Sequence, residues 1–169
     1  MKAALITFKV ITLMLVSMNL WSVNDTKITS NAFPEALSEF EFFIDQTKQQ
    51  PAKNVHPYEL ITTLFSDYSY KSRFVYVPEG KEGNYQKDWV YDFPVGTALI
   101  KTFYYPVDER NLDLGSKLLE TRVLLHKEKG WEAVSYAWND EQTEAFIKIA
   151  GKTINTSWIN HKGLSRDVR

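Results

Sequence analysis

The sequence contains no cysteine and only three histidines among its 169 residues. Without cysteine the chain has no disulfide bonds, no thiolate metal site, no cysteine nucleophile and no CxxCH motif for covalent haem attachment. The histidines, His56, His126 and His161, lie far apart, so no pair has the spacing of neighbouring metal ligands. We therefore expect no metal site and no covalently bound cofactor in this chain.

An excess of charge of either sign is also missing. Lys and Arg together number 20 and Asp and Glu number 21, which gives a formal net charge of −1. A chain without net positive charge has no bulk electrostatic attraction for nucleic acid or for an anionic membrane. We therefore expect no nucleic-acid partner.

Long apolar runs are scarce, and the one at the N-terminus has the features of a targeting signal. Residues 1–22 combine Lys2 and Lys9 with an apolar segment at 10–20 and the small residue Ser22. This is the pattern of a secretory signal peptide. The apolar segment is short for a membrane span. The sequence thus predicts an exported, periplasmic protein, with membrane attachment only if this segment stays uncleaved.

A single short helix is predicted near the N-terminus. Residues 23–32 are polar and predict a flexible leader. Residues 33–50 then show helical spacing and end before Pro51, which cannot continue a helix. The apolar positions that recur at this spacing are Phe33, Leu37, Phe40 and Ile44.

From Tyr58 onward the apolar pattern alternates with period two, which is typical of half-buried strands. The strands are short and are separated by turn signals, which favours an antiparallel sandwich or an open barrel. The sequence therefore predicts a mainly β domain over 33–160. Segments 145–150 and 153–158 are predicted to form a last hairpin, and 161–169 a polar tail.

The clearest predicted hairpin spans 118–138. Its turn contains Gly130, which is free to adopt positive φ. The first strand is expected to direct Leu119, Val123 and Leu125 inward, because these apolar residues alternate with polar ones.

A candidate interaction surface follows this hairpin at 138–144. Its carboxylates match the oxygen ligands of a cation such as Ca²⁺, and an Asp/Glu pair near aromatic residues suggests glycoside hydrolysis. The segment lacks the glycine spacing of an EF-hand loop, however, and a turn with local backbone bonds explains it better. The residues of this candidate surface are Trp138, Asn139, Asp140, Glu141, Gln142 and Glu144.

A candidate polar network involves Lys101, Glu120 and Arg122. Glu120 and Arg122 are two residues apart and so share one face of a strand, and Lys101 is predicted on a neighbouring strand. A carboxylate between two cations stays ionised. A cross-strand ion pair on the outer face explains the pattern best, and a partly buried network that ties the sheet together is the alternative.

Two further features concern catalysis and sugar binding. The adjacent Ser66 and Asp67 suggest a hydrolase, but no Gly-x-Ser-x-Gly elbow surrounds Ser66. We therefore expect that this chain alone is not an enzyme. Nine tyrosines and five tryptophans are many for this length. Exposed on one sheet face, they would form a platform for sugar rings or for a partner protein.

Short blocks spread along the chain carry a resemblance that no single motif would carry. They include Pro57-Tyr58-Glu59-Leu60, Leu64-Phe65-Ser66-Asp67-Tyr68, Phe93-Pro94-Val95-Gly96-Thr97, Glu120-Thr121-Arg122, Gly130-Trp131 and Tyr136-x-Trp138-Asn139. In this order they resemble the N-terminal β-rich domain of a largely uncharacterised family of exported bacterial proteins described as c-type (dihaem) cytochrome-associated. The resemblance covers the larger part of the chain.

The resemblance implies a context of periplasmic electron transfer. In that family the β-rich region is followed by a segment that leads into a CxxCH haem motif. Haem is therefore expected only from such a downstream segment or from a partner. The resulting prediction is a non-haem recognition or docking module, with a c-type cytochrome module or another protein as its partner. The alternative is a carbohydrate-binding module that uses exposed Trp and Tyr.

Overall fold

The computed structural model describes residues 22–148 and 155–168. The predicted signal peptide lies outside the described residues except for Ser22, and so does the turn of the predicted hairpin at 145–158. In chain order the elements are α1 (Asp25–Thr29), the 3₁₀ helix η1 (Leu37–Phe40), β1 (Phe43–Asp45), β2 (Gln50–Pro51), β3 (Val55–Pro57), β4 (Tyr70–Tyr76), β5 (Ala98–Pro106), the 3₁₀ helix η2 (Leu112–Leu114), β6 (Ser116–Lys127), β7 (Gly130–Trp138), β8 (Ala145–Ile147), β9 (Thr156–Ile159) and β10 (Ser165–Val168).

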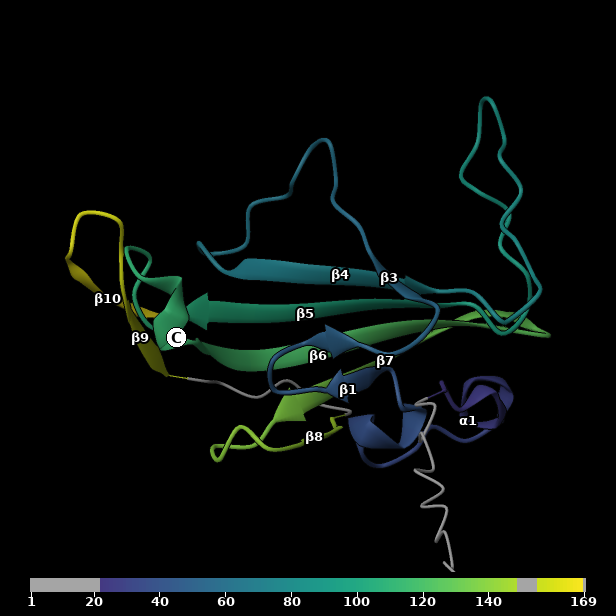
Figure 1. Ribbon diagram of the computed structural model, residues 1–169, viewed down its shortest axis with the longest axis horizontal. Coiled ribbons are helices and arrows are strands. Elements are labelled where there is room, and N and C mark those ends of the chain that lie inside the picture. Colours follow the sequence, from purple (N-terminus) through teal and green to yellow (C-terminus); the bar gives the residue numbers. More distant parts are fainter. Residues whose placement is uncertain (1–21, 149–154, 169) are drawn as a thin grey trace, which may run out of the picture.

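A six-stranded antiparallel sheet organises the molecule, with the strand order β3-β4-β5-β6-β7-β8 (Figure 1). Two small antiparallel sheets, β1-β2 and β9-β10, accompany it. In the described part of the chain the edge strands β3 and β8 do not pair with each other, so the sheet is open. The prediction of a mainly β, antiparallel fold is confirmed.

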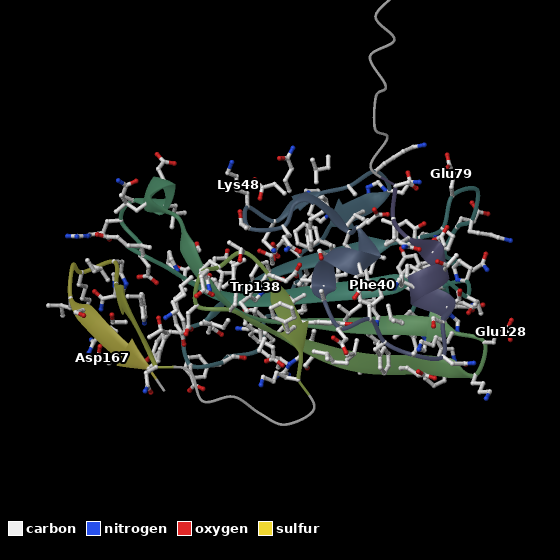
Figure 2. All side chains as sticks on the ribbon, turned by 90° about the horizontal axis from the view of Figure 1, so that it is seen from below. Phe40, Lys48, Glu79, Glu128, Trp138 and Asp167 are labelled. Carbon is white, nitrogen blue, oxygen red and sulfur yellow. The ribbon has the colours of Figure 1, made fainter. Side chains whose placement is uncertain are left out.

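Segments from the N-terminal part cover one side of this sheet, which we call the covered face. Phe40 of η1 stacks on Phe42 at a centroid distance of 4.8 Å and meets the edge of Tyr136 at 5.9 Å. Figure 2 shows Phe40 and Trp138 in the interior of the molecule. The core is built from apolar side chains of these segments and of the strands, including Leu37, Val55, Phe74, Ile100, Val123 and Leu125.

The opposite side of the sheet, which we call the open face, carries Lys101, Phe103, Glu120 and Arg122. The division follows from strand pleating, which sends successive side chains to opposite sides. Along β5, for example, Ile100 and Thr102 are fully buried, whereas Lys101 and Phe103 are only partly buried.

The prediction that Leu119 points into the core was wrong, because β6 contains a bulge at this residue. Phe103 pairs with Glu120 and Tyr104 pairs with Leu118, so Leu119 is an extra residue without a partner in β5. Because a bulge shifts the alternation by one position, Leu118 is buried in the core and Leu119 is only partly buried. Val123 and Leu125 point inward as predicted, and Gly130 adopts a φ of 118°.

The predictions for the N-terminal part were wrong in two respects. The expected flexible leader contains α1, and Ile28 of this helix is completely buried. The expected helix over 33–50 is replaced by η1 and two short strands, because Glu41 has a φ of 57° and ends the helical turn. At this change of direction the rings of Phe40 and Phe42 stack on each other.

The expected polar tail is also structured in part. β10 lies within 161–169 and pairs with β9, whereas the described part of β8 pairs with β7. The predicted pairing of 145–150 with 153–158 is therefore wrong for the described residues. Backbone hydrogen bonds from Glu109 N to Ile159 O (2.9 Å) and from Ile159 N to Val107 O (3.1 Å) hold the β9-β10 hairpin against the loop after β5.

Candidate functional site on the open face of the sheet

A row of three cations crosses the middle of the open face. Antiparallel pairing places Arg73 of β4 opposite Lys101 of β5, and Lys101 opposite Arg122 of β6. Adjacent strands lie about 4.8 Å apart, so the bases of these side chains are close neighbours. Lys71 adds a fourth cation two residues before Arg73 on the same side of β4. We call Lys71, Arg73, Lys101 and Arg122 the cation row.

Arg73 is buried although it belongs to the open face, with 4% of its side chain exposed. Its Nη1 donates a long hydrogen bond of 3.5 Å to Lys71 O and lies 3.7 Å from a carboxylate oxygen of Glu59. The Glu59 side chain is 82% exposed, so solvent screens this ion pair. The Arg73 Nε atom is buried and has no hydrogen-bond partner among the described residues. The guanidinium is therefore desolvated without being fully paired.

Arg122 is held by Glu120 in a two-pronged ion pair, with Nε and Nη2 donating to the two carboxylate oxygens at 3.0 Å each. Partial burial by itself would raise the pKa of the Glu120 carboxyl, but the hydrogen bonds from Arg122 and Ser135 outweigh it and the pKa lies below its ordinary value. The structure thus brings Lys101, Glu120 and Arg122 together, as the sequence predicted.

Phe103 lies between two of the cations. The Lys101 ammonium lies 4.6 Å and the Arg122 guanidinium 4.9 Å from the centre of its ring. Burial lowers the pKa of Lys101, and the neighbouring charges of Arg73 and Arg122 lower it further. The cation–π contact with Phe103 offsets part of the free-energy cost of burying the charged Lys101 ammonium.

The loop between β3 and β4, residues 58–69, displays apolar side chains to solvent. Ile61 is completely exposed, and Leu64 and Phe65 are more than two-thirds exposed. The loop is nevertheless anchored, because Lys71 Nζ donates to Leu64 O at 3.2 Å and the Tyr105 hydroxyl donates to Asp67 O. An anchored loop with exposed apolar groups is a surface ready for contact.

The loop between β4 and β5, residues 79–95, displays a second set of apolar and aromatic side chains to solvent. Trp89 and Val90 are each 83% exposed. Tyr85 contacts Tyr91, and Tyr91 stacks near Phe93, with ring centres 5.8 Å apart in both pairs. His126 Nδ1 bonds Phe93 O at 2.8 Å and fixes the base of the loop. Both loops extend beyond the β3-β4 edge of the sheet (Figure 1).

The candidate interaction surface at 138–144 is a tightly bonded turn. Asn139 Oδ1 accepts hydrogen bonds from Thr143 N at 2.9 Å and Glu144 N at 3.2 Å. Gln142 clamps the start of the β6 strand, accepting from Leu118 N at 2.6 Å and donating to Leu118 O at 3.1 Å. These side chains explain the turn by local bonding.

The prediction that Trp138 belongs to this surface was wrong, because only 2% of the residue is exposed. Its Nε1 donates to Thr121 Oγ1 at 3.0 Å, and Thr121 in turn bonds Thr102 Oγ1 at 2.8 Å. The even positions of β7 face the core, which buries this residue. Asp140 and Glu141 are exposed and Glu144 is partly buried, with its Oε1 accepting from Ser38 N at 3.3 Å.

Sequence reasoning missed Arg73 and the two loops. Alternation within Tyr70–Tyr76 does put Lys71 and Arg73 on one side, so the signal for two of the cations was present. The register that aligns Arg73 with Lys101 depends on contacts between distant parts of the chain.

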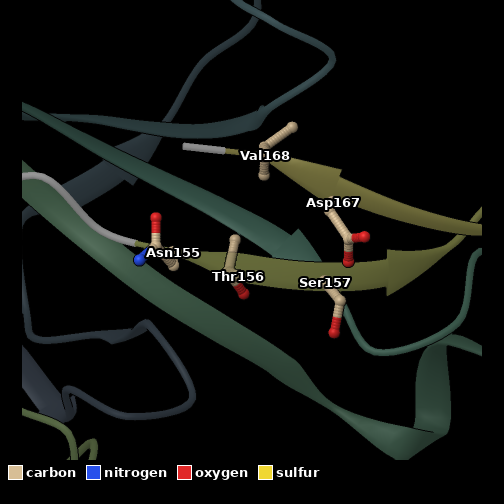
Figure 3. Close-up of a pocket in the computed structure, with 5 residues that line it drawn as sticks. All are labelled: Asn155, Thr156, Ser157, Asp167 and Val168. Atoms are coloured by element: carbon tan, nitrogen blue, oxygen red, sulfur yellow. The ribbon is translucent and has the colours of Figure 1, made fainter.

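A shallow hollow of about 410 Å³ lies on the β9-β10 hairpin (Figure 3). Its lining residues are Asn155, Thr156, Ser157, Asp167 and Val168. Asp167 is the only ionisable group among these five, and the hollow is separate from the cation row in the fold.

Over residues 22–148 and 155–168 no cluster of three His, Asp or Glu side chains has the arrangement of a metal site. In the same part of the chain no helix has the length and apolar character to cross a membrane. Comparison of the chain with protein-family models, curated proteins and solved structures finds no match.

Proposed function

We propose that this protein is an exported recognition module that docks a partner protein through loops 58–69 and 79–95. The observation that carries the proposal is the exposure of Ile61, Leu64 and Phe65 on one loop and of Trp89 and Val90 on the other. Burial of such side chains in a partner is favourable by about 25 cal/mol per Å² of apolar surface. Clustered exposed apolar residues are typical of interaction sites.

The partner we propose is a c-type cytochrome module, which agrees with the resemblance of the ordered sequence blocks to cytochrome-associated exported proteins. In this role the chain contributes contact surface and no redox group of its own. Both loops project beyond the β3-β4 edge of the sheet, so a partner can engage them together (Figure 1). Anchored loops lose little conformational entropy on binding, which favours affinity.

The docking proposal is tested with purified c-type cytochromes from the periplasm of the source organism, measured by biolayer interferometry on the immobilised full chain. The double variant Ile61→Ser, Phe65→Ser is expected to weaken binding at least about tenfold, because central apolar anchors dominate such interfaces. Leu112→Ser is the matched control, since Leu112 is exposed on η2 outside both loops. Equal loss in the control, or no binding by any cytochrome, contradicts the proposal.

Carbohydrate binding is a second candidate, favoured by the exposed aromatic rings of Tyr85, Trp89 and Tyr91 on loop 79–95. Such rings stack on the apolar faces of sugars. Quenching of tryptophan fluorescence by an oligosaccharide, lost in Trp89→Ala, is the expected result. Trp89 is the residue to test, because Trp138 is buried and cannot meet a sugar. Flat titrations across a broad glycan panel would remove this candidate.

A further inference from the structure

The open face holds more positive than negative charge in a small area. The cation row contributes four positive groups, and only two carboxylates, Glu59 and Glu120, form ion pairs with them among the described residues. Two positive charges are therefore unmatched. Lys101 makes no ion pair in this part of the structure, and Lys71 donates only to the backbone carbonyls of Leu64 and Ser69.

Arg73 provides the second, independent observation. A buried polar group without a partner costs about 1–3 kcal/mol, and more when it is charged. The Arg73 Nε–H is such a group, because it is buried and unpaired. Folding nevertheless places it beside Lys101, where repulsion between like charges adds to the cost. An anion between these side chains would relieve both unfavourable terms.

We propose that the cation row binds a phosphate group. Once Glu59 is displaced, Lys71, Arg73 and Lys101 have no carboxylate partner among the described residues, and a phosphate dianion neutralises more of this charge than a single carboxylate does. Its several oxygens can accept hydrogen bonds from Arg73 and Lys101 together, and Arg122 can contribute while it keeps its bond to Glu120. Arginine donors suit phosphate because the planar guanidinium presents N–H groups in a fork.

Loop 58–69 borders the cation row, because Lys71 Nζ donates to Leu64 O and Glu59 lies 3.7 Å from Arg73 Nη1. Glu59, which is largely exposed, contacts Arg73 loosely and is the group that an entering phosphate would displace. Displacing a solvent-screened ion pair costs little, because such pairs contribute about 0–1 kcal/mol. The loss of the Glu59 ion pair is therefore a small part of the cost of phosphate binding.

This inference is independent of the docking proposal, because it uses the sheet face and not the apolar side chains of the loops. The phosphate has two possible sources, a soluble phosphate or the headgroup of a phospholipid. Both present the same tetrahedral anion to the cation row, so the experiment separates them with two probes.

The first probe is inorganic phosphate, titrated into the full chain by isothermal titration calorimetry in chloride buffers of matched ionic strength. We expect one saturable site. Lys101→Gln is expected to weaken binding about tenfold or more, through loss of one charge-assisted hydrogen bond. Lys129→Gln removes the same charge from the exposed β6-β7 turn and is expected to leave the affinity unchanged.

Arg73 is buried, so its replacement by a neutral residue risks unfolding the sheet. Arg73→Lys keeps the charge and removes the Nε donor. We expect it to retain a native circular dichroism spectrum and to bind phosphate several-fold more weakly. No saturable binding by the wild-type chain to either probe, unchanged affinity in Lys101→Gln, or equal loss in Lys129→Gln would overturn the proposal.

The second probe is a vesicle of phosphatidylcholine that contains phosphatidic acid, with pure phosphatidylcholine vesicles as the reference. Sedimentation with the phosphatidic acid vesicles, abolished by Lys101→Gln, would assign the phosphate to a lipid headgroup. Binding of inorganic phosphate without sedimentation would assign it to a soluble source. Both results support a phosphate site, whereas failure of the docking experiment would leave either of them unaffected.

Discussion

The two faces of the six-stranded sheet are built from the same strands but handle polar groups in different ways. On the covered face Thr102, Thr121 and Trp138 form a closed chain of hydrogen bonds inside the core. On the open face the Arg73 Nε donor has no acceptor and Lys101 makes no ion pair, as far as the described residues show. These three hydrogen-bonded side chains on the covered face serve the fold, whereas Arg73 and Lys101 on the open face retain donors that a ligand can use.

The largest expected effect is the loss of a core side chain on the covered face. Trp138→Ala removes a fully packed ring and is expected to lower the free energy of unfolding by about 4 kcal/mol. Phe103→Ala on the open face is expected to cost no more than about 1 kcal/mol, mainly through its two cation–π contacts. Urea unfolding followed by circular dichroism measures both, and equal losses would abolish the distinction between the faces.

A smaller effect is expected from breaking the hydrogen-bond chain in the core. Thr121→Val removes the acceptor of Trp138 Nε1 and leaves that donor buried and unpaired, which is expected to cost about 2 kcal/mol. The single variant Trp138→Phe removes the donor, and the double variant Thr121→Val, Trp138→Phe removes both partners of the bond. A double variant whose loss equals the sum of the two single losses would contradict the assigned role of this bond.

The smallest effect concerns the ion pair on the open face. The folded-state pKa of Glu120 lies below the ordinary value of 4.5, so its carboxylate stabilises the fold above that pH and loses this contribution as the pH falls further. Glu120→Gln is expected to lower the free energy of unfolding by less than about 1 kcal/mol at neutral pH, since the pair is partly exposed.

The difference in the free energy of unfolding between Glu120→Gln and wild type is expected to shrink as the pH falls from neutral to about pH 3. Urea unfolding at each pH measures this difference. Glu128→Gln provides the control, because Glu128 is exposed on the β6-β7 turn and forms no ion pair among the described residues. A pH-independent difference for Glu120→Gln would mean that the ion pair makes no contribution to stability.

Period-two alternation made the strands predictable wherever they pair regularly. Residues of β5 and β7 face the sides that their spacing indicates. The prediction that Leu119 faces inward was wrong, because the adjacent Leu118 fits the core equally well and only the pairing with Phe103 and Tyr104 fixes the bulge.

Helical spacing gave a wrong answer at 33–50 for a related reason. Phe33, Leu37 and Phe40 fit a helix, but Phe42 and Phe43 are also buried, and no single helical side includes all five residues. Packing against Tyr136 and Phe74 outweighs the local preference and draws the segment into short extended pieces.

Sequence by itself determined the mainly β, antiparallel character of this protein, the turn at Gly130 and the neighbourhood of Lys101, Glu120 and Arg122, because strand pleating and turn chemistry act over a few residues. Tertiary structure decided which residues lie at the surface. It buried Trp138 and Arg73 and exposed Ile61 and Trp89. Exposure depends on the register of distant strands and on the path of the loops, and no local pattern encodes either of them.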